Sequence, residues 1–493
     1  MERLRRFFFT NNNTSQTVVK NTIWLILSEI ISRLFRFFII IYAARKLGAA
    51  GWGTFSYALG IGGILMIFSD IGLSGYITRE LTQGKEDSKQ MVSTAILNKM
   101  IMLIISTILM LGLGPLITKI PGAVALIPIV ALILFFDSLK ELGLAINRAY
   151  EKMERDAFVK IVTSTIVLIG GLALLKWNTT PTTLALIYLF SSILGFSIIF
   201  WILRGKISEI SWKAKKLLIL PIFANVLPFA FTSLLSSILA NTDIYMLGIW
   251  RTPSDIGIYS AGQRIYQFLL FIPSIIGVTT FPLLARLKTT DMNKFKKILE
   301  RSLSIVFLFG LPITIGGIVI AEEIVLASLG SAYIQAVPIF QILLLLVLIS
   351  FPSIIISNAI FASNRQKIFF ISSSVGAVSN IILNLLFIPP FGIIGATIST
   401  VISFALSTIL MWLTMKKVCS FCVLKNLKKP VLAGILMFFL CLLIELLGIN
   451  FIINVILSAL TYGLSLYLLK EESVIKIKDL LFFTNTETRT DPK

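Results

Sequence analysis

Histidine is absent from all 493 residues of the chain. This absence excludes a histidine proton relay, a histidine-bound metal and the Ser-His or Cys-His pairs of many hydrolases. The pattern Asp-x-Asp, which metal-dependent glycosyltransferases often use, does not occur either. Most hydrolytic and metal-assisted chemistry therefore lacks its usual side chains, and we expect no catalytic residue and no enzyme activity.

Cysteine is scarce, with three residues at Cys419, Cys422 and Cys441. Cys419 and Cys422 form a lone CxxC, which lacks the second ligand pair that a tetrahedral zinc site needs. Three cysteines also give no disulfide framework. We expect neither a metal site nor a cofactor.

Charged residues make up only 14% of the chain and hydrophobic residues 56%, whereas soluble domains carry about 25% charged residues. A soluble fold of this size could not bury so much apolar surface. The net charge is +20, but Lys and Arg lie between apolar stretches and not in one basic domain, so we expect no nucleic-acid binding. The composition predicts an all-α integral membrane protein.

Long apolar runs recur along the whole chain. A helix needs about 20 apolar residues to cross the hydrocarbon core. Fourteen transmembrane helices are predicted near 18–44, 54–78, 91–113, 122–146, 157–175, 182–203, 217–250, 256–284, 302–320, 335–361, 368–388, 391–415, 430–448 and 450–469.

The basic residues between these spans alternate in number. With residues at the span ends counted in the adjoining loop, 34 of the 44 Lys and Arg fall in the N-terminal segment, the even-numbered loops and the C-terminal tail, and 5 in the odd-numbered loops. Cytoplasmic loops carry the excess of positive charge. We therefore expect a multi-pass protein of the plasma membrane with both termini in the cytoplasm.

A weak internal repeat suggests two halves. Gly53-Thr-Phe-Ser56 opens the second span and Gly257-Ile-Tyr-Ser260 opens the eighth. Such repeats commonly enclose a substrate site at their interface. We predict two six-helix lobes around a central cavity, at 1–208 and 209–415, followed by two additional helices and a cytoplasmic tail at 416–493.

The first span carries Glu29, Arg33 and Arg36, which fall on one helix face at 100° per residue. Charged residues inside a membrane usually face a cavity or a partner. One interpretation is a site for phosphate oxygens, which arginine binds in bidentate fashion. The other is a structural i,i+4 pair between Glu29 and Arg33, which leaves the second arginine without a partner.

Two further pairs of intramembrane charges are expected. Asp70 and Lys99 should lie at similar depth, as an ion pair or as a proton or sodium coupling site. Asp243 and Arg264 stand in a comparable relation near the outer face, as a gate or a static pair. Asp137, Lys140 and Glu141 approach the end of the fourth span, where an interfacial role is expected.

Four stretches of the chain carry a family resemblance. They are Ala44–Gly48 with Gly51–Tyr57; Asp70–Arg79; Asp243–Gly248 with Ile256–Ile265 and Phe281–Leu287; and Phe391–Ala396. As a set, they resemble the polysaccharide and oligosaccharide flippases of the multidrug/oligosaccharidyl-lipid/polysaccharide exporter superfamily. The resemblance implies a two-lobed bundle that carries a polyprenyl-linked oligosaccharide, on a phosphate or pyrophosphate carrier, from the cytoplasmic to the outer leaflet by alternating access.

Cationic cavity residues of such flippases meet the anionic phosphate and sugar. By position, Arg33, Arg36, Arg264 and Lys99 are the candidates for substrate binding, and Glu29, Asp70 and Asp243 for coupling or gating. The expected partners are the lipid-linked oligosaccharide, membrane lipids and, as coupling ion, H+ or Na+. A flippase for the peptidoglycan precursor and a multidrug exporter of the same superfamily stay open as alternatives, although the exporter's often cationic substrates favour an acidic cavity.

Overall fold

Helices are the regular structure of this protein. The computed structural model describes residues 14–70, 72–83, 86–207 and 219–471, and within these ranges there is no β-strand. The all-α prediction is confirmed for this part of the chain. The predicted tail and the first residues of the predicted seventh span lie outside the described residues.

Two helices exceed 50 residues because a glycine joins two shorter segments in each. α2 (Thr14–Leu65) breaks at Gly48, whose φ of 67° lies in the left-handed region. α14 (Gln366–Val418) breaks at Gly392, with a φ of 60° and a ψ of −131°. Unbroken helices of 52 and 53 residues would be about 80 Å long, more than twice the hydrocarbon thickness of a bilayer, so each of the two is better described as two helices.

The predicted second span is not one continuous helix. After α2 the chain forms the short 3-10 helix η1 (Met66–Asp70), and α3 (Leu73–Gln83) begins beyond Gly72, which has a φ of 92°. The Asp70 carboxylate accepts a hydrogen bond from the backbone nitrogen of Ser74 at 3.2 Å and so satisfies one donor at the start of α3. Hydropathy alone did not reveal this interruption.

The other helices follow one another through short connections. Their bounds are α4 (Glu86–Ile117), α5 (Pro121–Ala149), α6 (Met153–Leu174), α7 (Pro181–Ile207), α8 (Ile219–Trp250), α9 (Pro253–Leu269), α10 (Phe271–Thr290), α11 (Met292–Val319), α12 (Ala321–Ser328), η3 (Ser331–Tyr333), α13 (Ala336–Ala362), α15 (Leu424–Leu446) and α16 (Phe451–Leu468).

Ten helical stretches in the described part of the chain are long and apolar enough to cross a membrane. Their outward faces carry large apolar side chains: Ile108 is 62% exposed, Phe439 63% and Leu468 69%. Apolar surface on this scale requires a lipid environment, because water would make it a site of aggregation. The chain is a multi-pass membrane protein.

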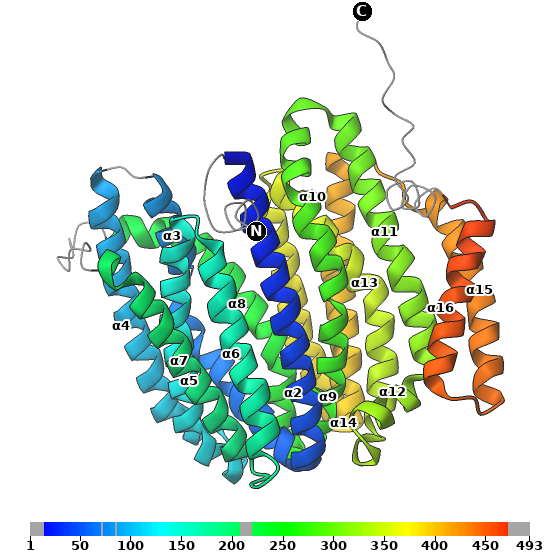
Figure 1. The fold of residues 1–493 in the computed structure, drawn as a ribbon, viewed down its shortest axis with the longest axis horizontal. Coiled ribbons are helices and arrows are strands. Elements are labelled where there is room, and N and C mark those ends of the chain that lie inside the picture. Colours follow the sequence, from blue (N-terminus) through cyan, green and yellow to red (C-terminus); the bar gives the residue numbers. More distant parts are fainter. Residues whose placement is uncertain (1–13, 71, 84–85, 208–218, 472–493) are drawn as a thin grey trace, which may run out of the picture. The chain divides into compact units, whose positions relative to one another are not determined.

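Packing divides the chain into two compact units. Unit 1 consists of Met1–Phe268, Ser328–Ile339 and Ser373–Ser403, and unit 2 contains the remainder. In unit 1, α2 packs against α6 and α5 against α7 (Figure 1). In unit 2, α11 packs against α15, and α15 against α16.

Two glycines of the predicted repeat touch within unit 1. A Cβ atom on Gly53 would lie 2.7 Å from the backbone nitrogen of Gly257, and one on Gly257 would lie 3.0 Å from the backbone nitrogen of Gly53. Both positions would also clash with backbone carbonyl groups. The backbones of α2 and α9 can approach this closely only because neither residue carries a side chain.

Candidate functional site

One face of α2 lines two adjoining cavities in unit 1. Glu29, Ser32, Arg33 and Arg36 recur at three- and four-residue intervals, so they share that face. Glu29 and Arg36 contribute to both cavities. The prediction that the three charged residues of the first span face a common space is confirmed.

The first cavity, here called the arginine compartment, has a volume of about 260 Å³. It is lined by Glu29, Arg33, Arg36, Phe37, Ile40, Arg264, Gln267 and Phe268. Phe37 of α2 and Phe268 of α9 stack with their ring centroids 4.2 Å apart. Three guanidinium groups against one carboxylate leave this compartment with a net charge of about +2, which favours an anionic ligand.

The guanidinium groups of the arginine compartment differ in their partners. Arg33 donates to the Glu29 carboxylate at 2.6 Å. Arg36 donates to the backbone carbonyl of Ser32 at 3.2 Å, and Arg264 to the side-chain oxygen of Gln267 at 2.9 Å. Neither Arg36 nor Arg264 forms an ion pair with a described carboxylate, and Nε of Arg264 has no hydrogen-bond partner there. Both therefore keep donors that can bind phosphate oxygens.

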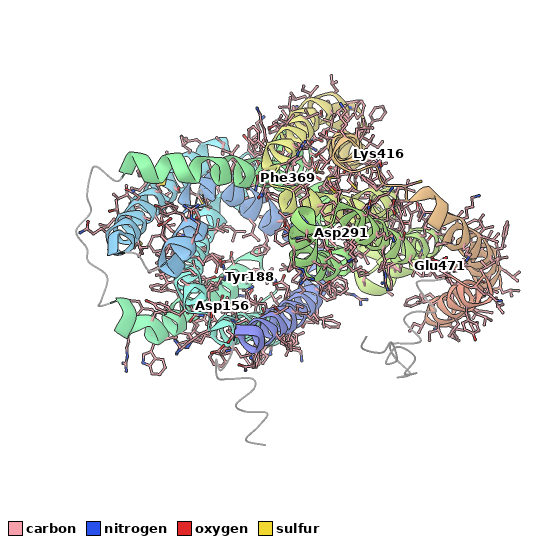
Figure 2. The ribbon with its side chains drawn as sticks, turned by 90° about the horizontal axis from the view of Figure 1, so that it is seen from above. Asp156, Tyr188, Asp291, Phe369, Lys416 and Glu471 are labelled. Carbon is pink, nitrogen blue, oxygen red and sulfur yellow. The ribbon has the colours of Figure 1, made fainter. Side chains whose placement is uncertain are left out.

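The second cavity, here called the hydroxyl compartment, has a volume of about 390 Å³ and lies among α2, α5, α6 and α7. Figure 2 labels Tyr188 on the inner side of these helices. Hydroxyl groups line much of its wall, from Ser32, Thr163, Ser164, Tyr188, Ser191 and Ser192. Such groups both donate and accept hydrogen bonds, as sugar hydroxyls do.

Among the described residues, three acidic and three basic side chains line the hydroxyl compartment, and all of them except Arg36 form ion pairs. Lys140 pairs with Asp137 at 2.5 Å, and Lys160 of α6 with Glu29 at 3.6 Å. Glu141 pairs with Arg148 at 2.8 Å. Asp137, Lys140 and Glu141 thus line a cavity, although the sequence suggested an interfacial role, because α5 turns this face toward α6 and α7. Sequence reasoning also missed Lys160, which joins this group only through the packing of α6 on α2.

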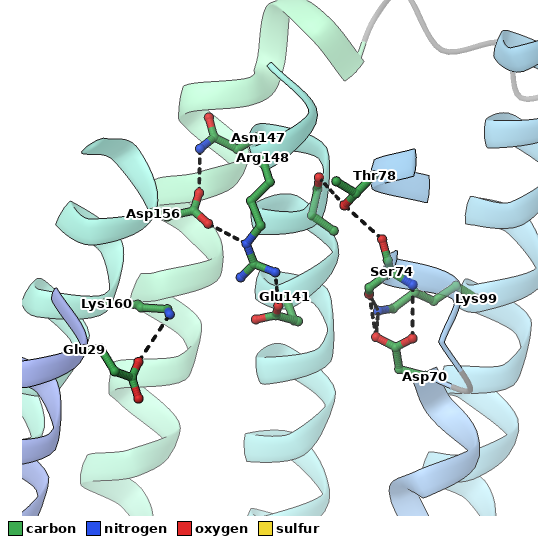
Figure 3. Close-up of polar contacts among 11 residues, drawn as sticks. Glu29, Asp70, Ser74, Thr78, Lys99, Glu141, Asn147, Arg148, Asp156 and Lys160 are labelled. Atoms are coloured by element: carbon green, nitrogen blue, oxygen red, sulfur yellow. Dashed lines mark hydrogen bonds and ion pairs between the residues drawn. The ribbon is translucent and has the colours of Figure 1, made fainter. Parts of the chain in front are cut away.

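Arg148 belongs to a network between α5 and α6 that the sequence did not predict. Its Nε lies 2.8 Å from the buried Asp156 carboxylate, which also accepts a hydrogen bond from Asn147 (Figure 3). This network links α5 to α6 and holds the Glu141 side chain in place. It therefore fixes one wall of the hydroxyl compartment.

Asp243 lies at the centre of a separate polar cluster in unit 1, with no exposed surface. Its carboxylate accepts hydrogen bonds from Tyr259 at 2.6 Å, Asn380 at 3.0 Å, Asn384 at 2.6 Å and Thr400 at 2.5 Å. In the described part of the chain no Lys or Arg forms an ion pair with it. The expected pair with Arg264 is therefore not formed, because hydroxyl and amide donors occupy both oxygens of Asp243.

The Asp243 cluster is rich in oxygen atoms. Oδ1 of the fully buried Asn384 has no hydrogen-bond partner among the described residues. A buried carboxylate without a basic partner is costly unless a proton or a cation neutralises it. Asn380 and Asn384 stand four residues apart in a predicted span, and this spacing was the signal that could have revealed them.

Asp70 and Lys99, for which the sequence left open an ion pair or a coupling site, form an ion pair with Nζ 2.7 Å from Oδ2. Lys99 has no exposed surface, and the hydroxyl of Ser74 lies within hydrogen-bond distance of both charged groups (Figure 3). Neither residue lines either compartment. The structure thus brings Arg33, Arg36, Arg264 and Glu29 together and leaves Lys99, Asp70 and Asp243 apart from them.

Known proteins are similar to this chain in sequence and in fold. Residues 18–288 match the profile of a family described as "Polysaccharide biosynthesis protein", and residues 228–386 match the MatE profile. The chain is 23% identical over 406 residues to the "Probable low-salt glycan biosynthesis flippase Agl15" of Haloferax volcanii, covering 80% of this chain and 82% of that protein. It is 23% identical to the capsular polysaccharide biosynthesis protein CapF of Staphylococcus aureus, over 78% and 96% of the two chains.

A solved structure shares the fold. The lipid II flippase MurJ in an inward closed conformation superimposes with a TM-score of 0.75 over 94% of this chain and 100% of that one. The sequence identity is 19%, so the likeness concerns the fold alone.

Proposed function

The chain belongs to the family of polysaccharide biosynthesis proteins, and from this premise we propose that it is a flippase for a lipid-linked oligosaccharide or polysaccharide repeat unit. It moves this substrate from the cytoplasmic to the outer leaflet of the plasma membrane by alternating access. The relative from Haloferax volcanii bears the name of a glycan biosynthesis flippase. The observation that carries the proposal is the net positive arginine compartment beside a cavity lined with hydroxyl groups.

The physical task of such a flippase explains this arrangement. A phosphate-linked sugar is too polar to cross hydrocarbon, because buried charge without a partner is expensive. Arg33, Arg36 and Arg264 offer charge-assisted hydrogen bonds that offset the loss of water around the phosphate. The hydroxyl compartment offers uncharged hydrogen bonds to the glycan, and the lipid tail stays in the bilayer.

The same charges argue against the rival substrates of the superfamily. A multidrug exporter with cationic substrates would meet repulsion from three arginines that face a single carboxylate. The peptidoglycan precursor also carries an anionic head group, so cavity charge does not separate it from other lipid-linked glycans. The polysaccharide family match favours the glycan.

We further propose fourteen spans with both termini in the cytoplasm, arranged as two six-helix lobes and two additional helices. The helices pair in order with the predicted spans when α2 and α14 are counted as two helices each, α9 with α10 as one, the second half of α2 with α3 as one, and the eight-residue α12 is left out. The alternation of basic loops supports the orientation.

For coupling we propose the Asp243 cluster, with H+ or Na+ as the ion. The support is its buried carboxylate, its lack of a basic partner in the described residues, and the oxygen atoms of Asn380, Asn384, Thr400 and Tyr259 around it. Sodium prefers such oxygen ligands, and a proton would neutralise the carboxylate directly.

A leaflet assay in the host tests the function. In a strain that lacks the gene, we expect the lipid-linked oligosaccharide to accumulate on the cytoplasmic leaflet. Wild-type protein should relieve the accumulation, and an inserted Arg33→Ala/Arg36→Ala variant should not. Normal export in the deletion strain, with no second transporter present, would remove the glycan assignment.

A further inference from the structure

Glu29 lies where the arginine compartment and the hydroxyl compartment adjoin. Among the described residues it is the only carboxylate that lines the arginine compartment, and it also lines the hydroxyl compartment. Two cations from two helices hold it. Its Oε1 lies 2.6 Å from Nε of Arg33 on α2, and its Oε2 lies 3.6 Å from Nζ of Lys160 on α6; Figure 3 shows the contact with Lys160.

This triad is open to the cavity and is not a sealed structural pair. The side chains of Glu29, Arg33 and Lys160 are 35%, 32% and 30% exposed. A ligand in the cavity can therefore reach each of them. Ion pairs with this degree of exposure are weak, so a stronger anion can replace the carboxylate.

The contacts of Arg33 make Glu29 a competitor of the substrate. A phosphate that enters the arginine compartment finds Arg36 and Arg264 without a described carboxylate partner, but Arg33 already holds one. The Nε–H group of Arg33 can bind a phosphate oxygen only when the carboxylate withdraws. Lys160 stands on the other side of Glu29 and can receive it without leaving a charge uncompensated.

We propose that Glu29 is an internal counter-anion: it stands in for the substrate phosphate at Arg33 in the ligand-free transporter, and an arriving phosphate displaces it toward Lys160. This inference rests on the proposed function. Glu29 acts through Arg33 and is thus a positioning residue. When the Glu29 carboxylate returns to Arg33, it favours release of the phosphate. A transporter needs such a step because it must release its substrate after binding it.

Binding of a defined probe tests the exchange. The purified full-length chain in phosphatidylcholine nanodiscs is titrated with a short-chain prenyl pyrophosphate by calorimetry. Glu29→Gln removes the competing charge and keeps the side-chain shape, so we expect about three- to fivefold tighter binding. In reconstituted transport the same variant should show a lower KM together with a lower kcat. Glu29→Asp should restore both toward the wild type.

Matched variants separate competition from a structural role. Glu322→Gln removes one negative charge at an exposed position of α12 and should leave binding unchanged. Lys160→Met removes the ammonium group toward which the Glu29 carboxylate is displaced, so we expect weaker binding of the pyrophosphate. In the Glu29→Gln background, Lys160→Met should have no further effect, which a double-mutant cycle measures.

Unchanged or weaker binding by Glu29→Gln would overturn the inference while leaving the flippase assignment intact, provided that the wild type binds the probe. Additive effects of the two substitutions would overturn it as well. If the wild type does not bind the pyrophosphate at all, the inference and the proposed phosphate site fail together.

Discussion

At the scale of single residues, charges inside the membrane separate into two kinds. Lys99 and Asp70 compensate each other at 2.7 Å and face no described compartment. Arg36 and Arg264 line the arginine compartment without a carboxylate partner in the described residues. We therefore propose that the first pair stabilises the fold and that the second two residues bind the ligand.

Breaking the hidden pair should therefore destabilise the fold. Removing one partner leaves the other charge buried, and we expect Lys99→Met or Asp70→Asn to lower the free energy of unfolding by about 3 kcal/mol. The double variant should lose less than the sum of the two, because no lone charge remains. Denaturation in detergent micelles measures this, with Lys176→Met at an exposed turn as control. Strictly additive losses would contradict the coupling.

The Asp243 cluster predicts a cation effect on stability. A cation that binds only the folded state raises the melting temperature as its concentration rises. If sodium is the coupling ion, NaCl should stabilise the wild type more than choline chloride does, and Asp243→Asn should abolish the difference. If the ion is a proton, the sodium effect should be absent and transport should follow an imposed pH gradient until Asp243 is replaced. An unchanged response of Asp243→Asn to both ions would exclude this cluster from coupling.

At the scale of the helices, glycine positions decide how segments bend and how closely they approach. Gly48 and Gly392 break the two longest helices through left-handed φ values. Gly53 and Gly257 allow the backbones of α2 and α9 to touch. Each of these helices therefore depends on a few glycines. A side chain there would strain the left-handed backbone or clash with the neighbouring helix.

The contact between α2 and α9 gives a direct stability prediction. Gly257→Ala would place a Cβ atom 2.7 Å from the backbone carbonyl carbon of Ala49, so the backbones must separate, at a cost of about 1–3 kcal/mol. Gly112→Ala in α4 is the matched control, since nothing lies within 4 Å of its Cβ position, and alanine should favour that helix by about 0.5–1 kcal/mol. Equal melting temperatures for the two variants would contradict the close packing.

The sequence predicted helices better than it predicted contacts, for a physical reason. Apolar runs and helical periodicity are local, so they located the spans and placed Glu29, Arg33 and Arg36 on one face. Lys160 and Tyr188 reach the hydroxyl compartment only through packing of distant helices, which no local pattern encodes. The break near Gly72 was missed because a left-handed glycine leaves no mark in a hydropathy pattern, although the segment after it, Leu73–Gln83, is clearly less apolar than α2.

At the scale of the whole molecule, the chain is a multi-pass membrane protein, and we propose that the charge of its cavity matches an anionic substrate. Ten membrane-length helices of the described chain and the match of residues 18–288 to the polysaccharide family support the class. The proposed fourteen-span arrangement includes an orientation, and that orientation can be measured with a native residue.

Cys422 reports the orientation. It is exposed, whereas Cys419 and Cys441 are buried, and it lies in a loop that we assign to the cytoplasm. A membrane-impermeant maleimide should label it in inside-out vesicles and not in intact cells. Asn178→Cys, introduced at an exposed turn on the opposite side in a variant with the native cysteines replaced by serine, should show the reverse. Labelling of Cys422 in intact cells would contradict the topology.

The central claim is that this chain carries a lipid-linked glycan through a site that depends on its arginines. The most direct measurement is translocation of a purified polyprenyl-pyrophosphate-linked oligosaccharide in proteoliposomes that contain only this protein. We expect the wild type to move the substrate between leaflets, and the inserted Arg33→Ala/Arg36→Ala variant to do so at least about tenfold more slowly, because two charge-assisted contacts with the phosphate are lost. Equal rates for the two proteins, or no translocation by the wild type under any cation gradient, would contradict the account.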